Sequence, residues 1–228
     1  MLRAIIFDFD GTILDTETPE YQAWREIYRQ HGADLPPAVW ARAVGTSADA
    51  FDPVGYLEEL IGQALPRDAI EAAQFDRVRA LIAGEVPRPG VVALLRAARE
   101  RHLKVGLASS SSRAYVAAHL ERLGLRGDFD VLSARDDVER VKPDPALYLY
   151  ALRRLGVAAT EAIAIEDSPN GLLAARAAGL ACLVVPNPVT IQFAFPADAI
   201  RRDSLDGVTL VFLENLRGAG IDQAGDGG

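Results

Sequence analysis

The sequence predicts an α/β protein in which a doubly wound, Rossmann-like parallel sheet forms the core and a smaller all-α domain, the cap, is inserted. Short apolar runs alternate with helical patterns through much of the chain. Residues 15–87 carry helical patterns only. The 228 residues are 50% hydrophobic, which is enough to bury one sizeable core and a smaller second one.

The strands are predicted from apolar runs that each end in a polar or turn cluster. Such runs are typical of strands buried on both faces. They cover residues 4–9, 104–108, 131–134, 162–165 and 181–185. Helical patterns with start and stop signals lie between the later runs, over residues 112–124, 144–156 and 168–179. This alternation implies right-handed βαβ units and a parallel sheet.

The cap is predicted from four helical stretches that follow the first strand. They cover residues 18–32, 37–44, 49–61 and 67–83. Apolar side chains at helical spacing, such as Tyr21 and Trp24, are most simply the core of this insert. We therefore expect a core domain of residues 1–14 and 88–217 and a cap of residues 15–87. We expect a disordered tail over residues 218–228, which are rich in Gly and Asp.

Composition narrows the class of protein. A net charge of -8 and a pI near 5.0 argue against nucleic acid and anionic membranes as partners. The start of the chain is too short and too acidic for a signal peptide, and no apolar stretch approaches the roughly 20 residues of a membrane span. The single cysteine, Cys182, lies in an apolar run, which suggests a reducing compartment. We expect a cytoplasmic protein, and a monomer.

The first strand ends in two carboxylates. Asp8 and Asp10 are two residues apart, so the alternation of a strand places both side chains on one side before Gly11 breaks it. Two carboxylates that close repel each other and need a cation or a proton between them. A hard divalent ion with oxygen ligands, Mg²⁺ above all, fits this need. Helix-capping aspartates are the alternative, and the other strand ends argue against it.

Polar side chains of suitable chemistry follow the other strands. Ser109 and Ser110 follow the second run, Lys142 lies between the third and fourth runs, and Glu166 with Asp167 ends the fourth. Ligands of parallel α/β sheets bind beyond the carboxyl ends of the strands, so these groups are expected at one site. Each has an ordinary alternative: serine caps helices, an isolated lysine is usually solvated, and an acid complements a helix dipole.

Four segments together resemble the ordered motifs of the haloacid dehalogenase superfamily. They are Asp8-Phe9-Asp10-Gly11-Thr12, Leu107-Ala108-Ser109-Ser110, Lys142-Pro143 and Glu166-Asp167-Ser168-Pro169-Asn170-Gly171. The match extends through nearly the whole chain. The insert after the first strand is similar to the helical C1-type cap of the β-phosphoglucomutase and sugar-phosphatase branch.

The resemblance implies a role for each core motif. Asp8 would attack phosphorus and form an aspartyl-phosphate, while Asp10 would protonate the leaving oxygen and then activate water. Ser109 and Lys142 would hold the transferring phosphoryl group. The Mg²⁺ ligands would be Asp167, helped by Glu166, together with the Asp8 carboxylate and the backbone carbonyl of Asp10.

The cap would close over a small phosphorylated metabolite, with hinges near residues 15–18 and 86–90. Substrate contacts are expected from five residues near the nucleophile or in the cap, with Trp24 as a further candidate. The five are Thr12, Glu17, Glu20, Thr46 and Ser110. A sugar phosphate and a two-carbon acid phosphate both remain open as substrates.

A mutase is the main alternative to a hydrolase. The mutases that this chain resembles carry a histidine where Glu20 stands, and an arginine after a cap glycine, whereas residues 45–49 here contain none. Thr12 stands where the mutases have valine. These differences favour hydrolysis. Two remote alternatives are a phosphorylation-controlled signalling domain, which would lack so large a helical insert, and a catalytically silent binding module, which the complete set of site residues disfavours.

Overall fold

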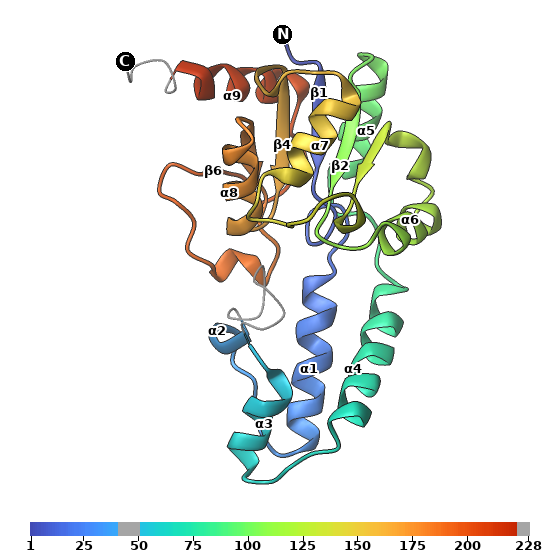
Figure 1. Cartoon of the computed structure of the whole chain (residues 1–228), viewed down its shortest axis with the longest axis vertical. Coiled ribbons are helices and arrows are strands. Elements are labelled where there is room, and N and C mark those ends of the chain that lie inside the picture. The colour runs from blue at the N-terminus through green and yellow to red at the C-terminus, as the bar shows by residue number, and fades with distance from the viewer. Residues whose placement is uncertain (41–50, 223–228) are drawn as a thin grey trace.

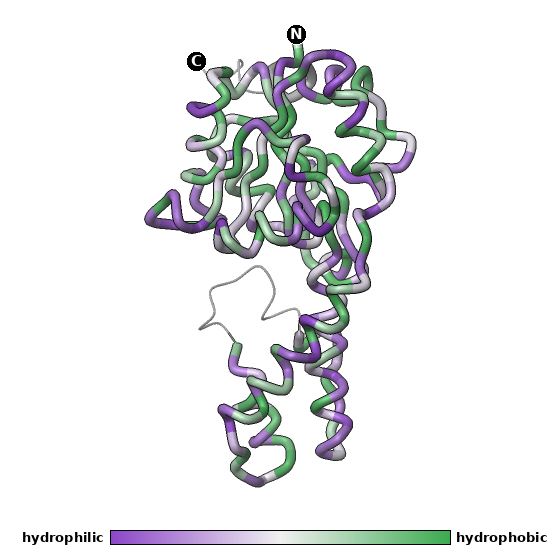
Figure 2. Tube along the Cα trace, turned by 90° about the vertical axis from the view of Figure 1, so that its right-hand side faces the viewer, coloured by the Kyte–Doolittle hydropathy of each residue, from purple (hydrophilic) through white to green (hydrophobic). Residues whose placement is uncertain are grey.

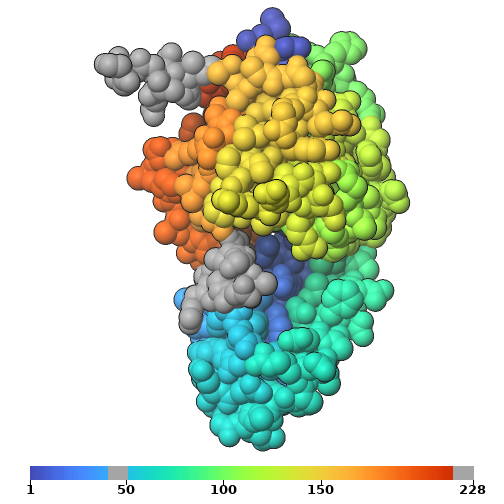
Figure 3. Space-filling model, viewed as in Figure 1, coloured from blue at the N-terminus to red at the C-terminus, as the bar shows by residue number. Residues whose placement is uncertain are grey.

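The computed structural model describes residues 1–40 and 51–222, with side chains up to residue 217. Figure 1 shows two lobes stacked along the long axis of the molecule. One holds the sheet and its flanking helices, and the other holds α1, α2, α3 and α4. In Figure 3 the surface is hollowed between the lobes, where part of the blue N-terminal segment comes into view.

Within the described residues the sheet has six parallel strands in the order β3-β2-β1-β4-β5-β6. Their bounds are β1 Ala4–Phe7, β2 Lys104–Ala108, β3 Val131–Ser133, β4 Ala162–Glu166, β5 Ala181–Val184 and β6 Ile200–Arg201. The chain builds outward from β1 through β2 to β3, then returns to the other side of β1 with β4. The strand order therefore reverses between β1 and β4, where sheets of this kind bind ligands.

The register brings the chemical residues to one level. Phe7, the last residue of β1, pairs with Leu107 on one side and with Ile165 on the other. Asp8 and Glu166 each come one residue further along, so they lie beside each other at the carboxyl ends of β1 and β4.

Helices cover both faces of the sheet, as alternating side chains of β1 require. Ile5 and Phe7 pack with α5 (Val91–Glu100), α6 (Arg113–Arg122) and α9 (Leu210–Asp222). Ala4 and Ile6 pack with α7 (Ala146–Leu155) and α8 (Pro169–Ala177) on the opposite face. Figure 2 shows hydrophobic residues running through the middle of this lobe. The described part of this lobe also has the short 3₁₀ turns η1 Arg126–Asp128, η2 Arg135–Asp137, η3 Ala159–Glu161 and η4 Thr190–Gln192.

The cap lobe has a separate apolar cluster. Its helices are α1 Glu17–Gln30, α2 Pro37–Trp40, α3 Pro53–Ile61 and α4 Arg67–Ile82. Trp24, Tyr28, Trp40 and Leu57 are buried at its centre. One residue of the core lobe, Val189, belongs to the same cluster. The cap core is therefore sealed in part by a loop from the other lobe.

The two crossings between the lobes lie side by side. Leu14 forms an antiparallel bridge with Pro87, and the Arg88 N–H donates to the Ile13 carbonyl at 2.8 Å. The Arg88 guanidinium also donates to the carbonyl of Gly11, to that of Val185 at 2.9 Å and to that of Pro186 at 2.8 Å. This arginine ties both crossings to the loop after β5.

The expected fold class is confirmed, and the differences are local. The first strand ends at Phe7 rather than at residue 9, because the Phe9 carbonyl accepts the N–H groups of Thr12 and Ile13 in a turn. In the cap, α3 begins at Pro53, where the Asp52 carboxylate accepts the Gly55 N–H at 3.0 Å. The apolar and helical patterns did not single out β6, α5 or α9.

At the end of the chain, α9 runs to Asp222, so residues 218–222 of the predicted disordered tail are helical. The other predicted segments at residues 41–44, 49–50 and 223–228 lie outside the described residues. The domain boundaries at residues 14–15 and 87–88 stay a prediction. No helix of the described residues is long and apolar enough to cross a membrane.

Candidate active site

A cavity of about 320 Å³ lies at the carboxyl ends of β1 and β4, under the cap. The core lobe contributes carboxylates, hydroxyls and a lysine, and the cap contributes two glutamates, a threonine hydroxyl and two aliphatic side chains. The lining residues are Asp8, Asp10, Thr16, Glu17, Glu20, Val78, Ile82, Ser110, Ser111, Tyr115, Val141, Lys142, Asp167, Ser168 and Asn170.

Asp8 is held in place by its backbone and by one carboxylate oxygen. Its N–H donates to the Ile165 carbonyl at 2.9 Å, which continues the pairing of β1 with β4. Oδ1 lies 2.5 Å from the Lys142 Nζ, whereas the buried Oδ2 has no hydrogen-bond partner among the described residues. Burial raises the pKa of Asp8 to about 7, against the opposing effect of Lys142 and with further contributions from Glu166 and Asp10.

Lys142 is a buried cation shared by two carboxylates. Besides Asp8, its Nζ lies 2.6 Å from the Glu166 Oε1, and it stands 5.3 Å from the centroid of the Tyr148 ring. The Tyr148 hydroxyl donates to the same Glu166 oxygen at 2.6 Å. Burial by itself would lower the pKa of Lys142, but Asp8 and Glu166 raise it above its ordinary value, so the ammonium is kept charged.

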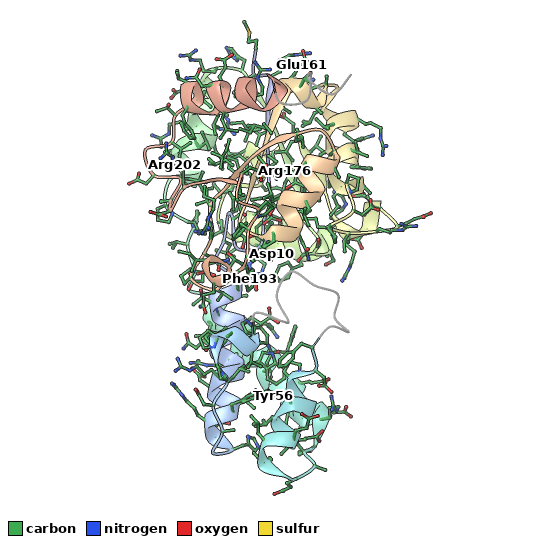
Figure 4. All side chains as sticks on the ribbon, turned by 90° about the vertical axis from the view of Figure 1, so that its left-hand side faces the viewer. Asp10, Tyr56, Glu161, Arg176, Phe193 and Arg202 are labelled. Carbon is green, nitrogen blue, oxygen red and sulfur yellow. The ribbon has the colours of Figure 1, made fainter. Side chains whose placement is uncertain are left out.

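Asp10 accepts hydrogen bonds from three hydroxyl groups. Ser109 and Ser111 donate to Oδ2 at 3.1 and 2.7 Å, and Thr16 donates to Oδ1 at 3.2 Å. Ser109 and Ser111 follow β2, while Thr16 precedes the first cap helix, so both lobes fix this carboxylate. Figure 4 shows Asp10 at the end of the core lobe that faces the cap.

Three buried carboxylates converge beside Asp8. Oxygens of Asp8, Glu166 and Asp167 lie within 4.8 Å of one another. Burial raises the pKa of Asp167 well above its ordinary value, with Asp8 and Glu166 adding to the effect. A site of this kind fits a hard divalent cation, because such an ion would offset the repulsion and would use the unpartnered Asp8 Oδ2. The Asp10 side chain does not belong to this cluster and points to the three hydroxyls. The role of its backbone carbonyl as a ligand stays a prediction.

Gly171 lets Glu166 lie against the start of α8. A Cβ at Gly171 would come within 1.9 Å of the Glu166 carboxyl carbon. Ser168 caps the helix, since its Oγ accepts the Gly171 N–H at 3.1 Å. The Glu-Asp-Ser-Pro-Asn-Gly segment therefore combines a strand end, a helix cap and the space that the acidic cluster needs.

The cap wall of the cavity is acidic. Burial raises the pKa of Glu17 well above its ordinary value, with neighbouring carboxylates, Glu20 first, adding to it. Burial likewise raises the pKa of Glu20 to about 7, with Asp10 adding to the effect. The Glu17 Oε2 is buried and has no hydrogen-bond partner in the described part of the chain. These two groups present unpaired acceptors to whatever enters the cavity.

The remaining candidate residues divide into three groups. Ser110 lines the cavity, and the fully buried Ser109 reaches it through Asp10. Thr12 and Trp24 are not among the described residues that line it: Thr12 faces a neighbouring pocket with Arg88, and Trp24 packs in the cap core. Thr46 lies outside the described residues.

Sequence reasoning missed several residues that complete the site. Ser111 stood in a run of four serines without being distinguished, and Thr16 lay within a predicted hinge with no sign that it would bond Asp10. Tyr148 lies in a predicted helix where no motif singled it out, although its hydroxyl bonds Glu166. Asn187, which donates to the Asp167 Oδ2 at 2.7 Å, is 20 residues away along the chain and carried no motif.

The chain belongs to the haloacid dehalogenase-like hydrolases: the model of that family matches residues 2–179. The family prediction from the four motifs is thus confirmed, and the protein is a hydrolase.

Similar proteins agree with this membership. The chain is 46% identical over 213 residues to YhcW of Bacillus subtilis, covering 93% of this chain and 96% of that protein. It is 35% identical over 177 residues to the fructose-1-phosphate phosphatase YqaB of Escherichia coli, covering 77% and 92%. Among solved structures, a D10N mutant of CbbY from Rhodobacter sphaeroides in complex with xylulose-(1,5)bisphosphate is 31% identical, with a TM-score of 0.73 over 94% of this chain and 100% of that one.

Proposed function

We propose that this hydrolase is a Mg²⁺-dependent phosphatase that removes phosphate from small phosphorylated metabolites, most simply sugar phosphates, through an aspartyl-phosphate on Asp8. One observation carries the proposal. Asp8, bonded to Lys142, and Asp10, bonded to three hydroxyls, line the same cavity at the strand-order reversal of the sheet. A nucleophile with a neighbouring acid is what the two halves of such a hydrolysis need.

In the first half-reaction, an Asp8 carboxylate oxygen attacks phosphorus as the bond from phosphorus to the leaving oxygen breaks. Lys142, held against Asp8, offsets charge on the transferring group, and the Ser110 and Ser111 hydroxyls line the space where its oxygens would lie. Protonated Asp10 gives its proton to the leaving oxygen, so that an alcohol departs.

In the second half-reaction, the Asp10 carboxylate takes a proton from a water molecule, and the water oxygen attacks phosphorus. The bond between phosphorus and the Asp8 oxygen breaks, which releases inorganic phosphate and restores the Asp8 carboxylate. The three hydroxyls around Asp10 keep its carboxyl group in one orientation for both proton transfers.

Asp8, Glu166 and Asp167 would hold the Mg²⁺, with the Asp10 carbonyl as the further ligand that the family resemblance implies. When bound, such an ion supplies charge neutralisation for the phosphoryl oxygens.

The cap wall supports a neutral, hydroxylated leaving group. Glu17 and Glu20 offer acceptors to hydroxyl groups, and Lys142 is the one basic side chain among the described residues that line the cavity. In their ionised form these two acids would repel a carboxylate or a second phosphate on the leaving group. We therefore rank sugar monophosphates above two-carbon acid phosphates. YqaB is named for such a sugar monophosphate, whereas the CbbY structure holds a bisphosphate.

A β-phosphoglucomutase-type transfer is the second candidate, because the same two half-reactions run with a sugar hydroxyl in place of water. It requires a bisphosphate intermediate that the acidic cap wall disfavours. For the protein as a whole we further propose a cytoplasmic monomer that acts on small molecules and binds neither nucleic acid nor membranes.

The test is phosphate release from a panel of esters: fructose 1-phosphate, β-glucose 1-phosphate, 2-phosphoglycolate and xylulose 1,5-bisphosphate, each with Mg²⁺ or with a chelator. Asp8→Asn serves as the nucleophile-deficient control. We expect release that requires Mg²⁺, that favours the sugar monophosphates and that is lost in Asp8→Asn. With a ³²P-labelled ester, the label should be retained on the wild-type protein after acid quench.

Other outcomes would overturn parts of the proposal. Glucose 6-phosphate that forms from β-glucose 1-phosphate without phosphate release would identify the mutase. Preference for 2-phosphoglycolate would contradict the inference that Glu17 and Glu20 favour a neutral, hydroxylated leaving group. No turnover of any ester, with a folded protein, would favour a binding module.

A further inference from the structure

We propose that Asn187 is a positioning residue: its side-chain amide orients Asp167 for cation binding. It also links that carboxylate to the loop after β5, against which the cap packs. The inference rests on the proposed cation site. Asn187 is 1% exposed, and its Nδ2 donates to the Asp167 Oδ2 at 2.7 Å. Among the described residues, it provides the side-chain hydrogen bond that reaches the Asp167 carboxylate.

The orientation of this amide is fixed by its other end. The Asn187 Oδ1 accepts the N–H groups of Val189 and Thr190 at 2.8 and 2.9 Å. The Asn187 N–H donates to the Thr190 Oγ1 at 2.9 Å, which closes the turn at the start of η4. Because Oδ1 has two donors facing it, the NH₂ group must face Asp167, and a flipped amide would lose all three bonds.

A neutral donor suits this position. An amide that bonds Oδ2 stops the carboxylate from rotating and leaves Oδ1 of Asp167 for a cation. A lysine or arginine at the same place would compete with the cation by charge, and an apolar residue would leave Oδ2 buried without a partner.

The loop that carries Asn187 is anchored to both crossings between the lobes. Arg88, in the second crossing, holds the carbonyl groups of Val185 and Pro186, directly before Asn187, and also that of Gly11 from the first crossing. The packing is close, since a Cβ at Gly11 would come within 2.6 Å of the Asn187 Nδ2 and still nearer to Asp167.

The same loop also enters the cap. Val189 is 6% exposed and belongs to the apolar cluster of Trp24 and Trp40, and Phe193 packs against that cluster. Figure 4 shows Phe193 where the core lobe meets the upper end of α1. A single residue, Pro188, therefore separates Asn187, whose side chain bonds Asp167, from Val189, whose side chain seals the cap core. A movement of the cap against Val189 would therefore be transmitted through Asn187 to Asp167.

The experiment measures cation binding directly, by isothermal titration of Mg²⁺ into the full-length protein without substrate. Asn187→Ser keeps an oxygen that can accept the Thr190 N–H but is too short to reach Asp167. We expect Mg²⁺ binding to weaken about 10- to 100-fold, as for other residues that orient metal ligands. The Mg²⁺ concentration for half-maximal phosphatase activity should rise by the same factor, with kcat recovering at saturating Mg²⁺.

Thr190→Val is the matched control, because it disturbs the same turn and leaves the amide bond to Asp167. It should lower the melting temperature and leave Mg²⁺ binding unchanged. Val189→Ala tests the tie to the cap: it should weaken Mg²⁺ binding by a smaller factor than Asn187→Ser. If Asn187→Ser does not fold, Asn187→Thr carries the same expectation.

Two results would overturn the inference. Unchanged Mg²⁺ binding by folded Asn187→Ser would show that Asn187 serves the loop alone, and unchanged binding by Val189→Ala would remove the tie to the cap. If the wild-type chain itself binds no Mg²⁺, it is the proposed cation site that fails, so the two failures are distinguishable.

Discussion

The two walls of the cavity differ in how their carboxylates are held. On the core wall each acid has a partner: Asp8 has Lys142, Asp10 has Ser111 and Asp167 has Asn187. On the cap wall, Glu17 and Glu20 have no ion-pair partner among the described residues, and both carboxyl pKa values are raised by burial. On the core wall every acid is held by a partner before a substrate arrives, and the Asp8 Oδ2 is left for the proposed cation, whereas on the cap wall neither acid is held by a partner in the described part of the chain.

This contrast separates the two tasks of the enzyme. Preorganised groups lower the barrier of the chemical step because they need no rearrangement during it. Unfilled acceptors on the cap select the leaving group, because only a ligand with matching donors relieves their burial. Changes on the core wall should therefore act on turnover, and changes on the cap wall on the choice of substrate.

The largest effect is expected from Lys142→Met. The chain has two lysines, and the other, Lys104, is the first residue of β2, at the end of the strand away from the site, and donates to the Leu155 carbonyl, which makes Lys104→Met a matched control. Loss of Lys142 should lower kcat/KM by about 10²- to 10³-fold, as for other groups that stabilise transition-state charge. It should also cost the metal-free protein about 3–5 kcal/mol, because Asp8 and Glu166 lose their buried counter-ion.

Steady-state kinetics and urea unfolding of both lysine variants check this. Equal losses in Lys142→Met and Lys104→Met would contradict the special role of the core wall.

A smaller effect is expected from Ser111→Ala. Its hydroxyl donates to the Asp10 Oδ2, whereas the adjacent Ser112 caps α6 by accepting the Tyr115 N–H at 3.3 Å. A hydrogen bond to a charged group contributes about 1.5–3 kcal/mol, so kcat should fall by roughly 10- to 100-fold in Ser111→Ala. Ser112→Ala should instead lower the unfolding free energy by ~1 kcal/mol and leave kcat in place. Single-turnover kinetics and thermal melts of the pair would separate these outcomes, and a reversed pattern would argue against Asp10 as the acid.

On turnover the smallest effect is expected from Glu20→Gln, which acts on stability and on substrate choice. Burial raises the Glu20 pKa from 4.5 to about 7, so folding favours the protonated form. The contribution of protonated Glu20 to the free energy of unfolding is complete below the ordinary pKa and is lost as the pH rises through about 7. Glutamine stays neutral, so the variant should be more stable than wild type by about 1–3 kcal/mol at pH ~8 and should match it near pH ~5.

Urea unfolding of the metal-free proteins at the two pH values checks the stability of Glu20→Gln. The order of preference among phosphate esters should change as well. A variant with the same pH dependence as wild type would mean that this carboxylate is solvated.

The catalytic residues of the core lobe could be predicted from the sequence because the ends of buried strands can be recognised in it. The predicted runs of residues 4–9 and 162–165 locate two strand ends to within two residues, and Asp8 and Glu166 stand there; parallel strands bring such ends together. Thr12 shows the limit of this reasoning. It follows the same motif, but the turn at Gly11, with a φ of 76°, directs it to a neighbouring pocket.

The supporting residues could not be predicted in the same way. Asn187 and Thr16 bond to site carboxylates only because loops fold back, and nothing in their local sequence marks the partner. The strand β6 has two exposed residues, too short a pattern to stand out. Cap side chains depend on how two lobes meet, so Trp24, at a helical position facing inward, could be either core or contact until the packing was known.

The paired crossings have a consequence for how such an enzyme diversifies. Since Leu14 bridges Pro87, the chain leaves the core lobe and re-enters it at nearly one point, so the cap hangs from the rest as a pendant module. A lineage could exchange, enlarge or reshape this module without moving Asp8 or Lys142, and without moving Asp167 as long as the contact of Val189 with the cap core is kept. One hydrolytic apparatus could then serve successive substrates through changes made on the far side of a single junction.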